Sequence, residues 1–244
     1  EELAELREKQ MTAGERVRYD GRCRDRQEPR DGVDPVVRFR NPLDGAVIVN
    51  DQVRGRVVFE NAQLDDLIIA RSDGTPTYNF TVIIDDHDMG ITHVIRGDDH
   101  LNNTPRQMNM LAALGADVPA YAHLPMILGS DGAKLSKRHG AVDIREYQEQ
   151  GYLPEAMLNY LGRMGWSMPD EREKFTLNEM IEHFDINRVS LGGPIFDLEK
   201  LSWLNGPWLR ELPVEQFASE VQQGAFYPRS MSQHAPHAQP PAPD

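Results

Sequence analysis

The segment of this 244-residue chain with the most evident chemistry is G-S-D-G-A-K-L-S-K-R-H-G at residues 129–140. It places Lys134, Lys137 and Arg138 between glycines, directly after an apolar run that we expect to be a strand. Cations on a loop at the carboxyl end of a strand can close over a phosphoryl group and offset the charge that develops there. The bare pattern K-x-x-K-R is also typical of a solvated basic hairpin, so this interpretation depends on the rest of the chain.

Two acidic clusters, D-D-H-D at 85–88 and D-D-H at 98–100, imitate sets of metal ligands. Consecutive residues of a strand point to opposite faces, so such a run cannot aim all its groups at one ion. We therefore interpret residues 85–88 as loop and capping groups. A metal-dependent phosphatase that uses these two clusters is an alternative function, which we rank below the others considered for this chain.

Composition excludes several classes of protein. The 39 acidic and 26 basic residues leave a net charge of −13, which argues against non-specific DNA binding through a basic surface. No apolar run approaches the roughly 18 residues of a membrane helix, and the charged opening E-E-L-A-E-L-R-E predicts no signal peptide. The single cysteine fits a reducing compartment. We expect a cytoplasmic protein without membrane or DNA partners.

The first 74 residues predict a helix, a loop and a small antiparallel unit. A glycine ends the expected helix, the following residues are polar, and N-P-L-D-G and N-D turn signals separate short β-type runs. The expected elements are a helix at 1–14, a loop at 15–35, strands at 36–39, 46–49 and 53–59, and an apolar run at 67–70 before a turn at 72–74.

From residue 75 the pattern changes to that of a parallel α/β sheet. Apolar runs at 78–84 and 91–95 precede a helix at 104–115, which Thr104 can cap and Gly115 ends, and a strand candidate follows at 121–128. Alternation of strand and helix is typical of parallel sheets.

The remainder reads as mostly helical at 143–222. Pro154 begins a helix whose apolar stripe we expect to be core, and the proline-rich end at 223–244 predicts disorder. The stripe consists of Met157, Leu158, Leu161 and Met164.

Several motifs together resemble the bacterial type of glutamyl-tRNA synthetase, a class I aminoacyl-tRNA synthetase. K-L-S-K-R resembles the K-M-S-K-S signature of that class, and the similarity extends in order over about residues 1–222. The other matching segments are Y-D-G-R-C at 19–23, P-T-Y-N-F at 76–80, I-T-H-V-I-R-G-D-D-H at 91–100, N-N-T-P-R-Q at 102–107 and G-Y-L-P-E-A-M-L-N-Y-L at 151–161.

The resemblance implies an α/β fold, the second half of a class I Rossmann-like catalytic domain. A small inserted α+β domain that binds the acceptor end would occupy 1–70, the catalytic part 71–142, and a helical stem-contact domain 143–222. The implied activity is ATP-dependent ligation of L-glutamate to tRNA(Glu) through glutamyl-adenylate, by a monomer that uses ATP with Mg²⁺.

The resemblance also implies roles for individual residues. Lys137 would stabilise the α-phosphate of ATP, with Lys134 and Arg138 supporting the loop. Arg96 would pair with the side-chain carboxylate of the substrate, because a guanidinium can hold a carboxylate in two parallel bonds and leaves a neutral amide unpaired. Tyr78 would line the amino-acid pocket.

Other positions would lie near the ATP and the tRNA end. They are Asp99, Ser136 and His100, whose ring could stack on adenine. Val82 stands where some family members have an asparagine that touches the substrate, so that contact is absent.

A zinc site is left open by the resemblance. Some family members bind zinc through a C-x-C pair and the tyrosine and cysteine of a Y-D-G-R-C segment. Tyr19 and Cys23 match the second half of that site, and the C-x-C pair would precede Glu1, so these residues alone cannot form a tetrahedral site.

The chain contains no H-I-G-H-like signature and no glycine-rich phosphate motif. We expect a fragment that lacks the first part of the catalytic domain and the anticodon-binding domain, and that is inactive alone. Two alternatives stay open: a glutamyl-queuosine-tRNA(Asp) synthetase-like enzyme, and a non-catalytic tRNA-binding module, which the missing signature favours.

Overall fold

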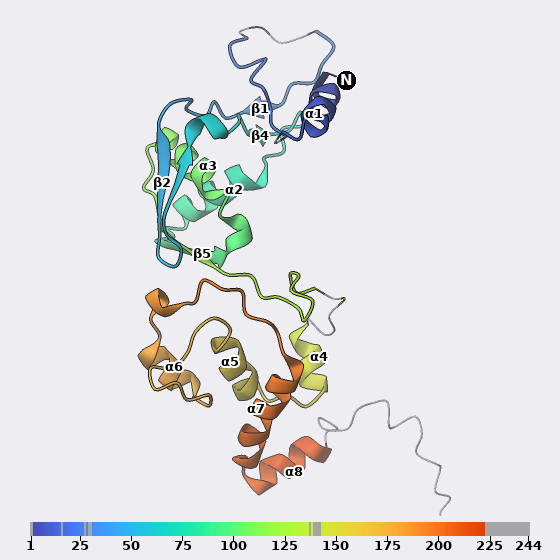
Figure 1. Cartoon of the computed structure of the whole chain (residues 1–244), viewed down its shortest axis with the longest axis vertical. Coiled ribbons are helices and arrows are strands. Elements are labelled where there is room, and N and C mark those ends of the chain that lie inside the picture. The colour runs from blue at the N-terminus through green and yellow to red at the C-terminus, as the bar shows by residue number, and fades with distance from the viewer. Residues whose placement is uncertain are drawn as a thin grey trace, which may run out of the picture. The chain divides into compact units, whose positions relative to one another are not determined.

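The computed structural model describes residues 2–15, 17–26, 28, 31–136, 138 and 143–222 (Figure 1). The chain divides into two compact units, with the boundary between Leu124 and Pro125. Lys137 and the segment 223–244, for which the sequence predicts a catalytic role and disorder, lie outside the described residues.

Unit 1 is built on a four-stranded sheet in the order β3-β2-β6-β5. β2 (Ala46–Asp51) and β3 (Gly55–Glu60) form the predicted antiparallel hairpin, and β6 (Ala120–Leu124) pairs in parallel with both β5 (His93–Gly97) and β2. β2 alternates exposed and buried residues, which is the pattern of a strand with one face on a core. The parallel α/β arrangement predicted from the alternation of elements is thereby confirmed.

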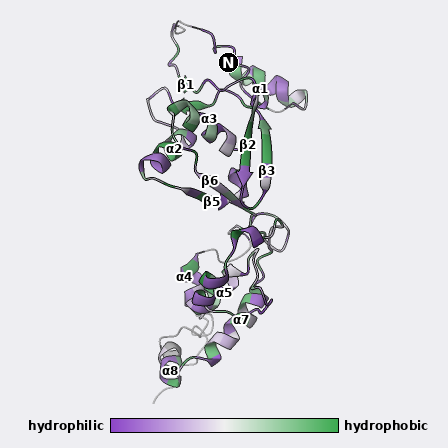
Figure 2. Ribbon diagram, turned by 90° about the vertical axis from the view of Figure 1, so that its left-hand side faces the viewer, coloured by the Kyte–Doolittle hydropathy of each residue, from purple (hydrophilic) through white to green (hydrophobic). Residues whose placement is uncertain are grey.

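One helix packs on this sheet, and a second helix packs against the first. α3 (Thr104–Leu114) packs against β2, and α2 (Tyr78–Asp88) packs against α3. Their contact is formed by Ile83, Met110 and Leu111, all almost fully buried. Figure 2 shows the hydrophobic colouring of β2 and β3. α3 ends as predicted at Gly115, whose φ of 69° is the left-handed conformation that favours glycine.

Two local expectations are wrong. Residues 85–88 were expected in a loop, but they form the last turn of α2. The apolar run before them belongs to the same helix, and its Ile83 packs against Met110 and Leu111 of α3. Thr104 is not the cap of α3: Asn103 precedes the helix and the Thr104 side chain is buried inside its first turn.

The first 77 residues confirm most of the predicted order. α1 (Glu2–Thr12) is followed by Gly14, with a φ of 67°, and the described residues between Gly14 and β1 (Val37–Arg38) lie outside helices and strands. β1 pairs antiparallel with β4 (Ile68–Ala70) in a separate two-stranded sheet. The short 3-10 helix η1 (Asn61–Gln63) comes between β3 and β4 in the sequence. Arg106 of α3 binds Asp65 at 2.8 Å, which joins the segment before β4 to that helix.

Unit 2 is helical, as predicted. Its core is formed by Tyr147, Met157, Tyr160, Leu201 and Leu204. The elements are α4 (Ile144–Glu149), α5 (Pro154–Gly162), α6 (Leu177–His183), the 3-10 helix η4 (Ile186–Arg188), α7 (Leu198–Arg210) and α8 (Val214–Gln222).

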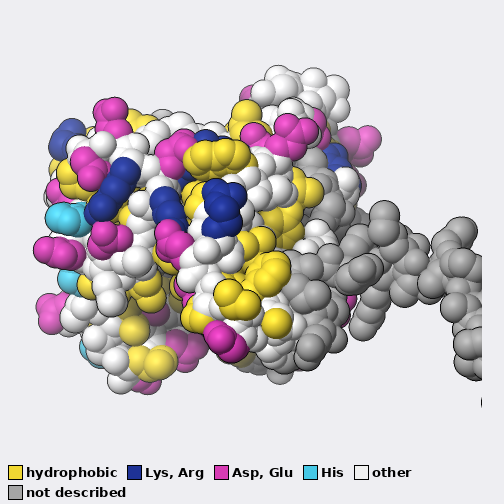
Figure 3. All heavy atoms as spheres, turned by 90° about the horizontal axis from the view of Figure 1, so that it is seen from below, with side chains coloured by type: hydrophobic (Ala, Val, Ile, Leu, Met, Phe, Trp, Pro, Cys, Tyr) yellow, Lys and Arg dark blue, Asp and Glu magenta, His cyan; other side chains and the backbone are white. Residues whose placement is uncertain are grey.

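The predicted core stripe of α5 is only partly correct. Met157 is buried, but Leu158 and Leu161 are 46% and 41% exposed, because the helix turns Ala156, Asn159 and Tyr160 toward its neighbours. Seen from below, hydrophobic side chains reach the surface among charged ones (Figure 3). No helix within the described ranges is both long and apolar enough to cross a bilayer.

Gly193 allows a close backbone approach in unit 2, which gives a stability prediction. A Cβ at position 193 would lie 2.7 Å from the Met126 carbonyl oxygen and 3.1 Å from the Leu128 side chain. Gly193→Ala should lower the free energy of unfolding by about 1–3 kcal/mol, the usual cost of overpacking. Urea unfolding followed by tryptophan fluorescence measures this unit alone, because all three tryptophans lie in it.

The adjacent glycine provides the control. A Cβ at Gly192 meets only the Ser190 hydroxyl at 3.8 Å, so Gly192→Ala should unfold close to the unaltered chain. Equal effects of the two substitutions would contradict the assignment of Gly193 as a close-approach position.

Candidate functional site

The strand register in unit 1 brings three polar residues to one edge of the sheet. Arg96 on β5 is the register partner of His123 on β6, and Asp51 ends β2 opposite Tyr121. The carboxyl ends of parallel strands lie at the same edge, which is where open α/β sheets bind ligands. Asp51, His123 and Arg96 therefore form a row from β2 through β6 to β5.

Neutral groups hold the guanidinium of Arg96. Its Nε donates to His123 Nε2 at 3.2 Å, and its Nη2 donates to Thr104 Oγ1 and Gln107 Oε1, both at 2.8 Å. Gln107 is fixed in turn, because its Nε2 donates to Asn79 Oδ1 at 2.9 Å. A guanidinium carries five N–H groups, so the two that remain are both on Nη1.

No carboxylate among the described residues forms an ion pair with Arg96. The nearby Asp98, in the 3-10 helix η2 (Asp98–His100), is bound to Arg54 instead. Asp86 on α2 interacts electrostatically with Arg96. Burial raises the pKa of the Asp86 carboxyl, and the positive charge of Arg96 opposes that shift. The site consequently presents a half-buried positive charge that the carboxylates of the described residues leave unpaired.

Asp51 and His123 form the fully buried end of the row. Their side chains are both 0% exposed, and His123 Nδ1 lies 2.6 Å from Asp51 Oδ2. Burial lowers the pKa of His123, against the opposing hydrogen bond to Asp51, so the ring is neutral at pH 7. Burial alone would raise the pKa of Asp51, but hydrogen bonds from the N–H groups of Arg54, His123 and Val53 and from the His123 ring lower it.

Tyr78 and His100 lie side by side next to this row. The Tyr78 hydroxyl is 3.3 Å from His100 Nδ1, and the two rings are 5.7 Å apart and tilted. Tyr78 is 49% exposed at the start of α2, so its ring can line a surface pocket. Asp99 is exposed in η2, between Asp98 and His100.

The basic signature belongs to unit 2, on a tight turn. Gly129 N–H donates to the Ala133 carbonyl at 2.8 Å, and Leu135 N–H donates to Ile127 at 2.9 Å. Gly132 has a φ of 73°, which the turn requires. The turn follows Leu128 as predicted, although β6 itself ends earlier, at Leu124.

The structure describes three of the four predicted residues of this loop. Lys134 is exposed at the end of the turn, and Ser136 lies two residues further on and is half-buried. Arg138 pairs with Asp131 at 3.2 Å in an exposed contact, which contributes little to stability and leaves the guanidinium able to move. Lys137 lies outside the described residues.

The two candidate zinc ligands are adjacent but insufficient. The Cys23 N–H donates to the Tyr19 hydroxyl at 2.8 Å, and Cys23 is exposed. Zinc takes four ligands in structural sites. Within the described ranges no group of three or more His, Cys, Asp or Glu side chains could hold a metal, so the residues present do not make a zinc site by themselves.

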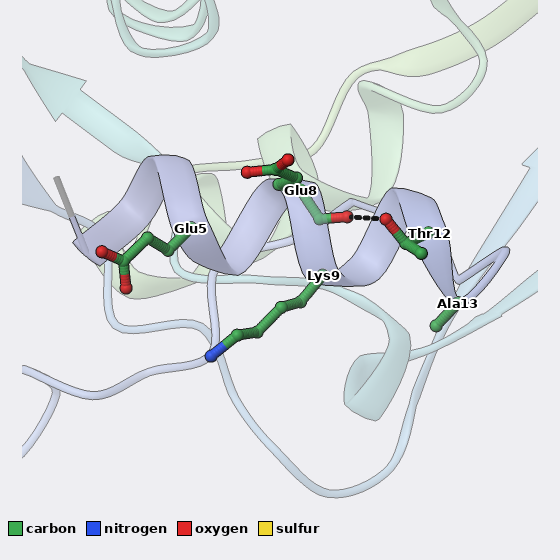
Figure 4. Close-up of a pocket in the computed structure, with 5 residues that line it drawn as sticks. All are labelled: Glu5, Glu8, Lys9, Thr12 and Ala13. Atoms are coloured by element: carbon green, nitrogen blue, oxygen red, sulfur yellow. Dashed lines mark hydrogen bonds between the residues drawn. The ribbon is translucent and has the colours of Figure 1, made fainter.

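An open hollow on α1 is unrelated to these residues. It is lined by side chains of that helix and by Ala13, which follows it, with the Thr12 hydroxyl donating to the Glu8 carbonyl at 2.8 Å (Figure 4). None of the predicted site residues lies there, and we assign it no role.

Sequence reasoning missed the partners that position Arg96. Asp51 was part of a turn signal, and Thr104 and Gln107 were read as a cap and a helix residue. His123 carried the best available signal, because an ionisable residue in the middle of the apolar run 121–128 is costly to bury without a partner.

Comparison with known proteins decides the family. Residues 1–203 match the model described as tRNA synthetases class I (E and Q), catalytic domain. The chain belongs to this family. The parallel α/β sheet of unit 1 is consistent with that catalytic fold.

Its curated relatives are named glutamate–tRNA ligase 1. The protein of Alkalilimnicola ehrlichii is 63% identical over 206 residues, which cover 84% of this chain and 44% of that protein. The protein of Nitrosococcus oceani is 59% identical over 221 residues, covering 91% and 47%. The chain thus spans about half the length of the curated relatives it matches.

Solved structures agree with this assignment. A glutamate tRNA ligase from Elizabethkingia meningosepticum, in complex with its amino acid, is 36% identical with a TM-score of 0.79, covering 91% of this chain and 50% of that one. The glutamate-tRNA synthetase from Elizabethkingia anophelis has the same identity and TM-score and is covered to 51%.

The neutral state of His123 gives a pH prediction. Its folded pKa is below the ordinary value of about 6.5, so the unfolded chain takes up this proton first as the pH falls. The contribution of His123 to stability should be complete above about pH 6.5 and decline as the pH falls toward the folded pKa. NMR titration of the ring should give a midpoint below 6.5, and a midpoint above 6.5 would contradict a neutral, buried imidazole.

Proposed function

We propose that this chain is the part of a glutamate–tRNA ligase that binds the substrate side chain and carries the basic signature loop. The complete reaction is ATP-dependent ligation of L-glutamate to tRNA(Glu) through glutamyl-adenylate. Family membership and the names of the relatives support the reaction. The observation that carries the substrate assignment is the half-buried charge of Arg96, which neutral groups hold and which no carboxylate of the described residues pairs with.

In this proposal Arg96 binds the side-chain carboxylate of L-glutamate through Nη1. Of the three nitrogens of this guanidinium, Nη1 is the one for which the described residues provide no hydrogen-bond partner. A carboxylate gains a charge-assisted bond there, whereas the neutral amide of glutamine leaves the buried charge uncompensated. Tyr78 lines the pocket, and His100, which it contacts, together with Asp99 lies toward the ATP and the tRNA end.

The signature loop would act on the other substrate. Lys137, supported by Lys134 and Arg138, would stabilise the α-phosphate as the glutamate carboxylate attacks it, with Ser136 near the ATP. Charge that develops on a phosphoryl group is stabilised by donors positioned over it. Mg²⁺ comes with ATP and neutralises its phosphates.

We also propose the domain roles at 1–70, 71–142 and 143–222, a monomeric state and a cytoplasmic location.

The substrate assignment predicts a selective loss of binding. Arg96→Gln keeps hydrogen-bond donors but removes the charge, so the affinity for L-glutamate, measured by NMR titration, should fall at least about 10-fold. We expect binding by the unaltered chain to be weak, about millimolar, because so small a ligand has few contacts to contribute.

Arg56 supplies the matched control. It is an exposed arginine on β3 of the same unit, so Arg56→Gln removes the same charge without touching the site. An equal loss of affinity for L-glutamate in both variants would mean that only the net charge of the unit matters. That result would contradict the proposal.

A second prediction concerns activity. The chain has no H-I-G-H-like segment for the ATP phosphates, so by itself it should transfer little or no glutamate to tRNA(Glu). Aminoacylation with labelled glutamate tests this, with a complete synthetase as the positive control. Turnover close to that control would contradict the prediction, and tRNA binding without any dependence on ATP or glutamate would favour a non-catalytic module.

A further inference from the structure

Two fully buried ionisable side chains, Asp51 and His123, have no part in the proposed reaction. They lie 2.6 Å apart with no exposed surface, and His123 is one of the three groups that hold Arg96. Burying ionisable groups is costly unless they are hydrogen-bonded, so a buried pair beside a binding residue requires an explanation. One oxygen of Asp51, Oδ1, has a structural role, because it accepts hydrogen bonds from the N–H groups of Val53 and Arg54 in the β2–β3 turn. This role does not explain why His123 is buried beside Asp51.

The contacts determine which nitrogen of His123 carries the proton. The carboxylate of Asp51 can only accept, so Nδ1 donates to it and the lone pair of Nε2 faces the Nε–H of Arg96. The other tautomer, or an imidazolium, would place an N–H against the guanidinium. The orientation of Arg96 thus depends on the tautomer that Asp51 selects.

The imidazole also separates two charges. A carboxylate placed directly against Arg96 would orient it equally well but would neutralise it, and the preference for an anionic ligand would be lost. Here the anion of Asp51 lies one neutral ring away, on the far side of His123. The arrangement orients the guanidinium while leaving its charge for a ligand at Nη1.

We infer that Asp51 and His123 are positioning residues that make Arg96 select a carboxylate over an amide. This inference rests on the proposed function, because it assumes that Arg96 binds the side chain of L-glutamate. Asp51 fixes the tautomer of His123, His123 fixes the plane of the guanidinium, and Thr104 and Gln107 complete the orientation from α3. The result is specificity for L-glutamate over L-glutamine.

The test measures a ratio of affinities, which general damage to the fold would not change selectively. Kd values for L-glutamine and L-glutamate are measured by NMR at pH 7 for the unaltered chain, His123→Leu and His123→Gln. Leu removes the acceptor at similar size, whereas Gln can offer its amide oxygen near the position of Nε2. The ratio of glutamine Kd to glutamate Kd should fall about 10-fold in His123→Leu and be largely restored in His123→Gln.

A second measurement uses the unaltered chain, in case His123→Leu does not fold. The ring ¹⁵N shifts of His123 at pH 7 should show a single neutral tautomer protonated at Nδ1. A tautomer protonated at Nε2, or an imidazolium, would overturn the inference, and so would an unchanged ratio in a folded His123→Leu variant. If the unaltered chain shows no preference for L-glutamate, the proposed function at Arg96 fails, and the specificity role of the pair fails with it. The ¹⁵N shifts then still decide whether Asp51 orients His123.

Discussion

A guanidinium that leaves bulk water without a carboxylate partner has to be held by neutral acceptors, and much of unit 1 serves this requirement at Arg96. The acceptors come from β6 and from two positions of α3, so a strand and a helix have to be placed correctly before the charge is stable. The parallel register of β5 and β6 puts Arg96 beside His123, and the end of β2 puts Asp51 behind it. The fold thereby maintains a positive charge that a ligand, rather than the protein, can neutralise.

Three other arginines of unit 1 are paired with carboxylates. Arg54 binds Asp98, Arg106 binds Asp65 and Arg24 binds Asp66, each joining segments far apart in the sequence. The first pair joins the β2–β3 turn to η2, the second joins α3 to the segment before β4, and the third joins the loop after α1 to that same segment. Arg96 differs from these three arginines, because its hydrogen-bond partners among the described residues are the neutral side chains of His123, Thr104 and Gln107.

The sequence predicted the elements whose local signals agree with their packing. The helix at 104–115 had a proline in its first turn and a glycine at its end, and the run at 91–95 became β5. Residues 78–88 illustrate the opposite case. Their β-branched run Thr81-Val82-Ile83-Ile84 favours a strand by propensity, but packing of Ile83 against α3 overrides that preference. The exposed Leu158 and Leu161 show that apolar spacing indicates a helix without saying which apolar residues its neighbours cover.

The candidate site divides in the same way. Motif resemblance could single out Arg96, Tyr78 and His100, because they stand within recognisable strings of residues. It could not find Asp51 or His123, since their roles depend on a strand register that joins positions 72 residues apart. The position of Lys137 lies outside the described residues, so its role rests on the motif alone.

The most direct test of this account is a crystal structure of the chain with L-glutamate. We expect a side-chain carboxylate oxygen of L-glutamate about 3 Å from Arg96 Nη1, with the hydrogen bonds from Arg96 to His123, Thr104 and Gln107 unchanged. A side-chain carboxylate bound to another cation, with Nη1 making no contact to it, would contradict the assignment of Arg96 as the residue that reads the substrate.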